Sequence, residues 1–245
     1  MSEIPYGHYF QAVIFDLFGT LVDIFKVSEY KKNLSDITEA LGLEPGRFAA
    51  AWKDTWDAFP YGNYPSVQAR FALALELYHD SAAYPRPGGL QKAITIRDDY
   101  IRGQAFKIKD GTIDSIKWAI REGYKVGMVS NCSMETALSW KQSPLAKFIP
   151  DPTFSCLVQL KKPDPKIFLN ETNKLKVDPS RCIYVADGDD HEFDTVRQLG
   201  MTTILVKYNT DDAYRHEPFP DNEHSITHFR ELPAIVAKLE GAMRA

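Results

Sequence analysis

Short, mostly apolar runs that end at a polar or acidic residue recur along the chain. The first covers residues 12–15 and leads directly into Asp16, a pattern typical of a buried strand with a polar tip. Similar runs predict three further strands, at residues 125–129, 182–186 and 202–206. Apolar residues at helical spacing predict helices at residues 113–121, 193–199 and 232–243. Strands that alternate with helices favour an α/β fold with a doubly wound, Rossmann-like parallel sheet.

Residues 24–106 show a different pattern. Helical spacing dominates there without a clear strand, in segments at residues 27–43, 46–59 and 66–79. We therefore predict a helical domain inserted after the first strand. The expected domains are a core of residues 1–22 and 107–245 and an inserted domain of residues 23–106.

Composition narrows the class of protein. The 245 residues are 44% hydrophobic, enough for a large core in one domain or in a core domain with a smaller inserted one. The net charge of −4 gives no broad attraction to nucleic acid or anionic membranes. No apolar run approaches the roughly 20 residues that span a bilayer, and the three cysteines do not form CxxC pairs. We expect a cytoplasmic monomer or homodimer with a small-molecule substrate and no membrane or nucleic-acid partner.

The first candidate for chemistry is Asp16. In open α/β sheets, ligands bind beyond the C-terminal ends of the strands, where this carboxylate stands. Gly19 follows it and allows the backbone to turn. A carboxylate at this place can act as nucleophile, base or metal ligand. The alternative is an aspartate that only begins a turn.

The next strand tip carries Ser130 and Asn131, whose side chains could donate hydrogen bonds to an anion. Their alternative role is to cap the following helix. Lys162 stands before Pro163 and Pro165, which stiffen the segment. A lysine held in this way could neutralise a phosphate or the carboxylate of Asp16; an ordinary solvated lysine is the alternative.

The fourth strand tip is rich in acids. Residues 187–194 contain five acidic side chains, beginning with Asp187, and these repel one another unless a cation compensates. Mg²⁺ prefers carboxylate oxygens and is the natural compensating ion. The alternative is an exposed acidic loop near the start of a helix. We expect Asp187 to face the site and Asp189 to face solvent.

Taken together and in this order, the four motifs resemble those of the haloacid dehalogenase superfamily of hydrolases. The matching segments are residues 16–22, Ser130 at its strand end, Lys162 in its Lys-Pro-Asp-Pro sequence, and residues 185–188 followed by Glu192. The resemblance implies that the helical insertion is a cap domain.

The resemblance also implies roles for individual residues. Asp16 would form a covalent aspartyl intermediate, and Thr20, Ser130 and Lys162 would hold the transferred group, with Asn131 beside them. Mg²⁺ would be bound by Asp16, the backbone carbonyl of Phe18 and Asp187. A further carboxylate would come from Glu192 or Asp190.

One position departs from the phosphatase pattern. Phosphatases of this family carry a second aspartate two residues after the nucleophile, where this chain has Phe18. The dehalogenase branch has an aromatic residue there, but it does not use Mg²⁺ and has fewer acids at the fourth motif. The first hypothesis is a Mg²⁺-dependent hydrolase of a phosphorylated or phosphonate metabolite. The alternatives are a 2-haloacid dehalogenase and a low-activity binding or regulatory protein.

Substrate contacts are assigned to Phe18, Gly19 and Arg70. Arg70 belongs to the inserted domain and could grip a carboxylate or phosphate. Trp52 and Trp56 lie four residues apart and either pack that domain or line a pocket. His191, beside the acidic motif, is a candidate proton carrier in place of the missing acid.

Overall fold

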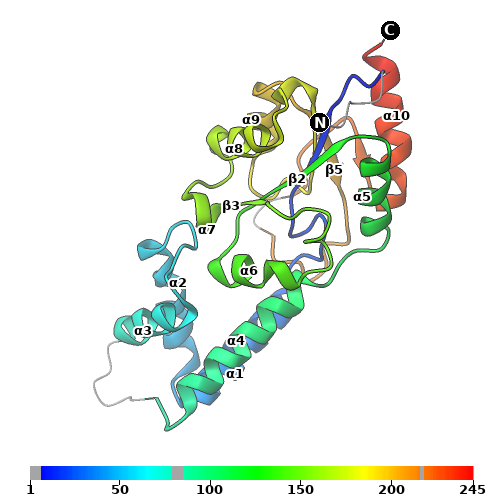
Figure 1. Ribbon diagram of the computed structural model, residues 1–245. Helices are drawn as coiled ribbons and strands as arrows, with labels where there is room; N and C mark the ends of the chain where they lie inside the picture. Colours follow the sequence, from blue (N-terminus) through cyan, green and yellow to red (C-terminus); the bar gives the residue numbers. More distant parts are fainter. Residues whose placement is uncertain (1–6, 79–84, 216–217, 245) are drawn as a thin grey trace.

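A computed structural model of the chain describes residues 7–78, 85–215 and 218–244 (Figure 1). Six strands form one sheet in the order β3-β2-β1-β4-β5-β6, and every neighbouring pair is parallel. The strands are β1 (Ala12–Phe15), β2 (Lys125–Ser130), β3 (Thr153–Phe154), β4 (Cys182–Ala186), β5 (Thr202–Val206) and β6 (Ser225–Ile226). The predicted α/β fold with a doubly wound parallel sheet is confirmed.

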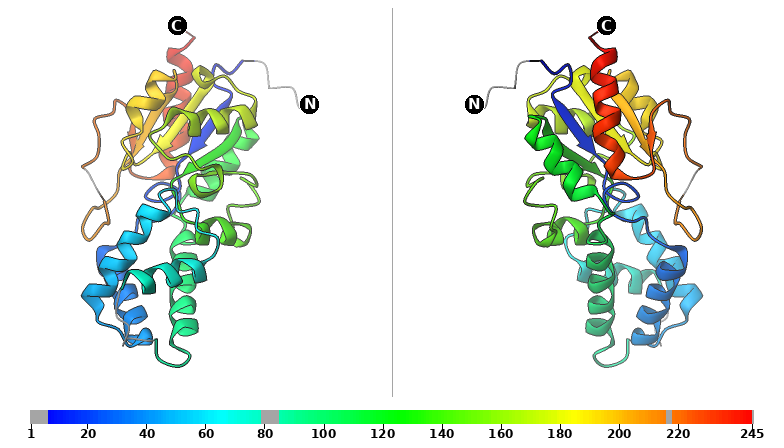
Figure 2. Two further views of the ribbon diagram at one scale, coloured as in Figure 1. Left: turned by 90° about the vertical axis from the view of Figure 1, so that its left-hand side faces the viewer. Right: turned by 90° about the vertical axis from the view of Figure 1, so that its right-hand side faces the viewer.

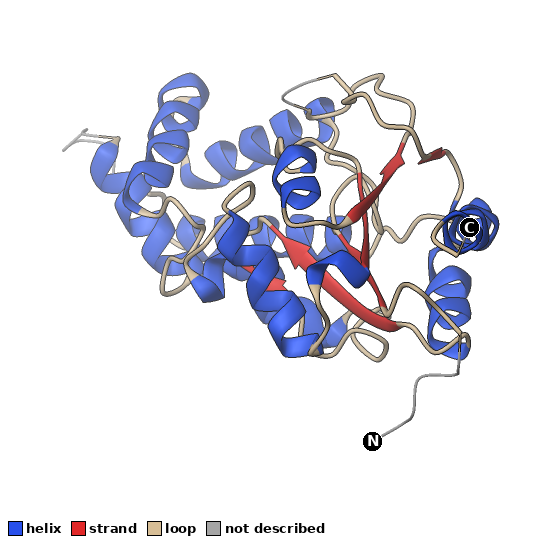
Figure 3. Cartoon of the chain, turned by 90° about the horizontal axis from the view of Figure 1, so that it is seen from above, coloured by secondary structure: helices blue, strands red, loops and turns tan. Residues whose placement is uncertain are grey.

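The central strands are apolar throughout because both faces of the sheet are covered. Val13 and Phe15 of β1 point into one hydrophobic cluster, together with residues of α5 and α10. Ala12 and Ile14 point into a second cluster on the opposite face, with residues of α8 and α9. Figures 2 and 3 show helices on both sides of the sheet.

The helices of this core are short. The α-helices of this core are α5 (Thr112–Arg121), α6 (Met134–Ser139), α7 (Ser155–Val158), α8 (Pro165–Leu175), α9 (Phe193–Gln198) and α10 (Leu232–Ala242). The carboxylate of Asp164 caps α8 by accepting from the backbone N–H of Lys166 at 2.9 Å, and Pro165 starts the helix.

Four helices follow β1 and lie beyond one end of the sheet (Figure 1). They are α1 (Val27–Leu41), α2 (Pro45–Ala58), α3 (Val67–Leu77) and α4 (Gly89–Ala105), and we call them the helical insert. Phe48, Trp52 and Phe71 stack at the centre of their own hydrophobic cluster. The insert therefore has a separate core, while the exact domain boundaries stay a prediction.

Most predicted elements agree with the structure to within a few residues. The helix predicted at residues 66–79 corresponds to α3, and His79 lies outside the described residues. The three cysteines are buried free thiols. No helix in the described ranges is long and apolar enough to cross a membrane.

Candidate active site

The carboxylate of Asp16 lies at the C-terminal end of the central strand β1 and is almost fully buried. Its backbone N–H continues the sheet by donating to the carbonyl of Val185 at 3.0 Å. The loop then turns at Gly19, which has a φ of +76°. A side chain at Gly19 would collide with the carboxylate of Asp187, so glycine lets the two acidic strand tips approach.

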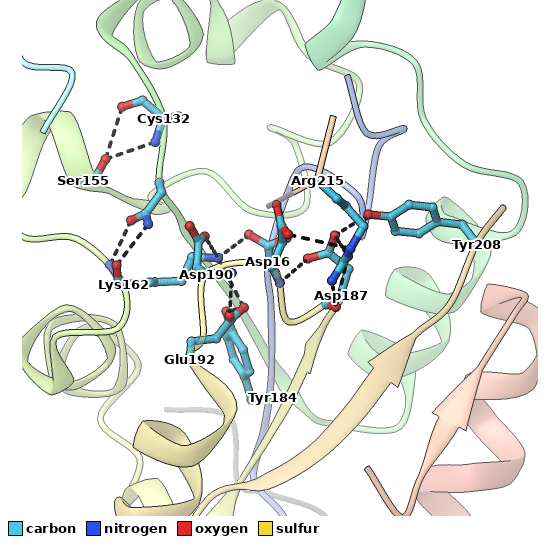
Figure 4. A network of polar contacts seen from close by, with 12 residues as sticks. Asp16, Cys132, Ser155, Lys162, Tyr184, Asp187, Asp190, Glu192, Tyr208 and Arg215 are labelled. Carbon is cyan, nitrogen blue, oxygen red and sulfur yellow. Dashed lines mark hydrogen bonds and ion pairs between the residues drawn. The ribbon is translucent and has the colours of Figure 1, made fainter. Parts of the chain in front are cut away.

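Lys162 lies close to three acids, and Asp16 is one of them (Figure 4). Its Nζ lies 2.6 Å from Asp16 Oδ1, 2.9 Å from Asp190 Oδ2 and 3.6 Å from Glu192 Oε1. Burial lowers the pKa of Lys162, but these carboxylates outweigh it and raise the pKa well above its ordinary value. Lys162 is therefore a fixed cation beside the candidate nucleophile.

Asn131 holds this lysine from the tip of β2. Its side-chain oxygen accepts from the backbone N–H of Lys162 at 2.9 Å, and its amide group donates to the Lys162 carbonyl at 3.2 Å. Both ends of the amide thus position Lys162. This contact was not foreseen, since the sequence suggested that Asn131 donates to a bound anion or caps a helix.

A second cation lies on the other side of the nucleophile. Arg215 donates from Nη1 to Asp187 Oδ2 at 2.9 Å, and the hydroxyl of Tyr208 donates to the same oxygen at 2.6 Å. Arg215 Nε also lies 3.7 Å from Asp189 Oδ1. The pair of Asp189 with Arg215 and its position at the cavity contradict the expectation that Asp189 faces solvent.

Lys109 adds a third cation that the sequence analysis missed. It donates to the backbone carbonyl of Gly19, and its Nζ stands 4.3 Å from the centre of the Tyr208 ring. Burial lowers the pKa of Lys109 to about 8. Tyr208 and Arg215 follow β5, which ends at the same edge of the sheet. No pattern in the sequence marks either residue as part of a site.

The acids of the site are destabilised in their ionised forms. Burial, together with repulsion from Asp16, raises the pKa of Asp187 to about 6. Burial and nearby carboxylates, opposed by Lys162, raise the pKa of Glu192 to about 7. Burial also raises the pKa of Asp16 itself, against the attraction of Lys162. These shifts indicate more buried negative charge than the neighbouring cations offset.

Two predicted site residues have buried hydroxyls without a hydrogen-bond partner in the part of the chain that the structure describes. Thr20 Oγ1, in the loop after β1, and Ser130 Oγ, at the tip of β2, lack a hydrogen bond within the described residues. A buried hydroxyl without a partner is costly, so an ordered ligand or water is expected there. Anionic oxygen atoms would accept hydrogen bonds from both groups, in agreement with the predicted roles of Thr20 and Ser130.

A cavity of about 290 Å³ opens over Asp16. Asp187, Asp189 and Asp190 line it from the edge of the sheet, and Arg70 lines it from the helical insert. Phe18 also lines the cavity, and its ring packs on Phe25 with 4.6 Å between centroids. Residues of the first, second and fourth motifs thus line one cavity, and Lys162 of the third motif contacts Asp16.

Other candidates are placed differently. His191 has an exposed side chain and borders a separate surface hollow with Gly188, so it does not face Asp16. Trp52 packs in the core of the insert, whereas Trp56 is 40% exposed and lines the cavity. The alternatives left open for the two tryptophans therefore both occur, one for each residue.

The carboxylates of the site have the chemistry to bind a hard divalent cation. Asp187 and Glu192 have raised pKa values, so a nearby cation would stabilise their ionised forms. Across the described ranges, however, no group of three or more His, Cys, Asp or Glu side chains is arranged to hold a metal. The physical reason is visible at Asp187, whose Oδ2 already accepts from Arg215 and Tyr208. A metal bound through Asp187 Oδ2 would therefore require this pair to give way, whereas Oδ1 accepts from the backbone N–H of Asp189 at 3.3 Å. The magnesium site stays a prediction.

Comparisons with known proteins identify the family of the chain. The family model of haloacid dehalogenase-like hydrolases matches residues 10–200. The glyceraldehyde 3-phosphate phosphatase of Methanopyrus kandleri is 28% identical over 123 residues, which cover 48% of this chain and 51% of the relative. The (S)-2-haloacid dehalogenase 1 of Pseudomonas sp. (strain CBS-3) is 21% identical over 94% of this chain and 97% of the relative.

The comparison with solved structures shows a similar fold over nearly the whole chain. The 2-haloacid dehalogenase of Pseudomonas syringae pv. Tomato DC3000 is similar with a TM-score of 0.66 and 18% identity, covering 94% of this chain and 99% of that chain. At this identity the likeness concerns the fold. For two of the curated relatives that it matches, the chain covers about half of their length or less.

Proposed function

The chain belongs to the haloacid dehalogenase-like hydrolase family, and we propose that it hydrolyses a small phosphorylated or phosphonate metabolite through a covalent intermediate on Asp16. The resemblance found in the sequence is thereby confirmed at the level of the family. Phosphatases and dehalogenases both occur among its relatives. The choice between the two reactions therefore rests on the chemistry of this site.

The observation that carries the proposal is the surplus of acids around the nucleophile. Five carboxylates face three cationic side chains, which leaves two negative charges in excess when all groups are ionised. The acids are Asp16, Asp187, Asp189, Asp190 and Glu192, and the cations are Lys109, Lys162 and Arg215. A dehalogenase needs no such surplus, whereas a divalent cation would offset it.

The proposed reaction has two displacements. An oxygen of Asp16 attacks phosphorus and the bond to the leaving group breaks, so that a phosphoaspartate forms; water then attacks phosphorus and releases phosphate and Asp16. Lys162 keeps Asp16 oriented through the 2.6 Å contact. Thr20 and Ser130 would donate their unpaired hydroxyls to the phosphoryl oxygens.

Mg²⁺, when bound by Asp16, the Phe18 carbonyl, Asp187 and Glu192 or Asp190, would offset the charge of phosphate and nucleophile. Phe18 supplies no proton to the leaving group. The proposed substrates are therefore those whose leaving group departs without a strong acid, or that carry their own proton donor.

One observation favours dehalogenation as a second candidate. Arg215 supplies a cation to Asp187 in place of a metal, and Phe18 stands where a phosphatase has its acid. In that reaction Asp16 would attack carbon while the carbon–halogen bond breaks. Halide departs without a proton, and water would then hydrolyse the ester of Asp16.

A substrate panel separates the two reactions. Phosphate release from p-nitrophenyl phosphate and halide release from 2-chloropropionate are measured with Mg²⁺ and with excess chelator, and Asp16→Asn serves as the inactive control. Phosphate release that requires Mg²⁺ is the expected result. Halide release that persists in chelator, without phosphate release, would overturn the proposal in favour of the dehalogenase.

A further inference from the structure

Two arginines of the helical insert are buried in the wall that faces Asp16. Arg70 of α3 is 1% exposed and Arg97 of α4 is 5% exposed, and both line the cavity over the nucleophile. The sequence analysis assigned Arg70 to substrate binding, whereas it predicted no helix at α4 and did not single out Arg97. Burial of two guanidinium groups is unusual without partners of opposite charge.

The contacts of the pair leave donors unused. Arg70 donates from Nε to Thr55 Oγ1 at 3.0 Å, and Arg97 donates from Nε to Glu135 Oε1 at 3.2 Å. Nη1 of each arginine is buried and has no hydrogen-bond partner within the part of the chain that is described. In the same part of the chain, Glu135 is the one carboxylate that forms an ion pair with either of them.

The charge of the pair is therefore incompletely balanced. Burial raises the pKa of Glu135 to about 8, which weakens its ability to neutralise Arg97 near neutral pH. Burial, with repulsion from Arg97, lowers the pKa of Arg70 to about 9, so Arg70 still carries its charge at that pH. Two close cations with at most one ionised partner favour an anion between them.

Aromatic rings fix the orientation of Arg70. Its guanidinium carbon lies 4.0 Å from the centre of the Trp52 ring, 4.8 Å from that of Trp56 and 5.2 Å from that of Tyr64. Stacking of this kind keeps the planar group rigid and ready to bind. Arg97 is 5.5 Å from the same Trp52 ring, so one tryptophan connects the two arginines.

We infer that Arg70 and Arg97 form an anion subsite that binds a second anionic group, carboxylate or phosphate, of a substrate whose reacting group lies at Asp16. The assignment of this ligand as substrate rests on the proposed function. Apolar side chains, among them Phe18, Phe25 and Ile101, line the cavity that Asp16 and the two arginines also line. The substrate class is thus a short molecule with an anion at each end of an apolar or weakly polar segment.

Binding, rather than turnover, tests the subsite. Calorimetry is run on the whole chain with succinate, malonate and inorganic phosphate, and with succinamide as the uncharged control, at constant ionic strength. Arg70→Met and Arg97→Met should each weaken the binding of the preferred anion by about tenfold to a hundredfold, since a charge-assisted bond in a buried site is lost. The preferred probe distinguishes a carboxylate subsite from a phosphate subsite.

The control variant is Arg102→Met, which removes an exposed arginine of the same helix α4 that pairs with Asp99. It should bind the anion with unchanged affinity. Arg70→Lys and Arg97→Lys keep the charge and guard against misfolding; they should bind more weakly than the wild type and more tightly than the methionine variants. Equal affinity in the wild type and in both methionine variants, with the native fold retained, would overturn the subsite.

The test also separates this inference from the proposed function. If no substrate in the panel releases phosphate or halide but Arg70→Met still loses anion binding, the proposed function fails and the subsite stands. If phosphate is released but none of the anions binds through the arginines, the subsite fails alone.

Discussion

The two walls of the cavity over Asp16 carry opposite charge. The sheet wall, formed by strand tips, presents Asp16, Asp187, Asp189 and Asp190. The helical wall, formed by the insert, presents Arg70 and Arg97. Each wall holds charge that its own neighbours do not fully balance, as the raised pKa of Asp187 and the unpaired Nη1 atoms indicate.

The difference shows which partner each wall requires. Excess carboxylates favour a cation, and excess guanidinium groups favour an anion. A cation at the sheet wall together with an anionic substrate that reaches the helical wall would satisfy both. On this view the sheet wall carries the chemistry and the helical wall selects the substrate, and the following changes examine that division.

The largest effect is expected from Asp16→Asn, which removes the nucleophile from the sheet wall. The variant should lose at least about 10⁴-fold in turnover, since the amide oxygen does not form the covalent intermediate. Binding of succinate or phosphate by the helical wall should change little. Full activity in this variant would rule out the covalent mechanism, and loss of anion binding would contradict the division between the walls.

The positions of these residues were only partly predictable from the sequence. β1, β2, β4 and β5 were found because buried parallel strands are continuous apolar runs. β3 and β6 were missed because two residues carry no periodic pattern. The strand tips converge on one edge of a parallel sheet, which is why Asp16, Ser130 and Asp187 could be grouped before their geometry was known. Lys162 precedes a helix, and it was added to this group by the family resemblance of its motif.

The remaining site residues depend on contacts that no local pattern encodes. Arg215 reaches Asp187 from an irregular loop, 28 residues further along the chain. Arg97 is one of several charged residues in α4 and differs from Arg102 only in the direction of its side chain. Such residues are identified by three-dimensional packing, because helical spacing alone does not distinguish a cavity wall from a solvated face.

The second largest effect is expected from Phe18→Asp, which adds a proton donor to the sheet wall. If departure of the leaving group is slow because no acid protonates it, turnover of alkyl phosphates should rise by about 10²-fold. Turnover of p-nitrophenyl phosphate should change less, because its leaving group departs readily. A variant that keeps its thermal stability but shows no gain on alkyl phosphates would mean that the proton is supplied elsewhere.

Arg215→Met tests whether the sheet wall binds a metal cation. Arg215 and Tyr208 occupy Asp187 Oδ2, so removal of the guanidinium should tighten Mg²⁺ binding by about tenfold, measured by calorimetry without substrate. Arg230→Met, which removes an exposed arginine paired with Asp110, is the matched control and should bind Mg²⁺ as the wild type does. Weaker Mg²⁺ binding in Arg215→Met would show that Arg215 supports the metal site instead of competing for it.

The smallest effect concerns Glu135, the acid next to Arg97. Burial raises its pKa in the folded protein to about 8, above the ordinary value of 4.5, so the folded state holds this proton more tightly than the unfolded state. The stability that the proton contributes is present at low pH and is lost as pH rises toward 8. The ion pair with Arg97 opposes this loss. The free energy of unfolding of the wild type should therefore fall between pH 5 and pH 8 from this group by less than the roughly 3.5 kcal/mol that a pKa of about 8 alone would give.

Glu135→Gln should remove that part of the decline, as measured by urea unfolding at several pH values without ligand. The exposed Glu223 provides the control, since Glu223→Gln should keep the pH dependence of the wild type. If both variants show the same decline, Glu135 is ionised throughout and neutralises Arg97. The helical wall would then retain a single unbalanced cation at Arg70, and the second anionic group of the substrate would bind mainly there.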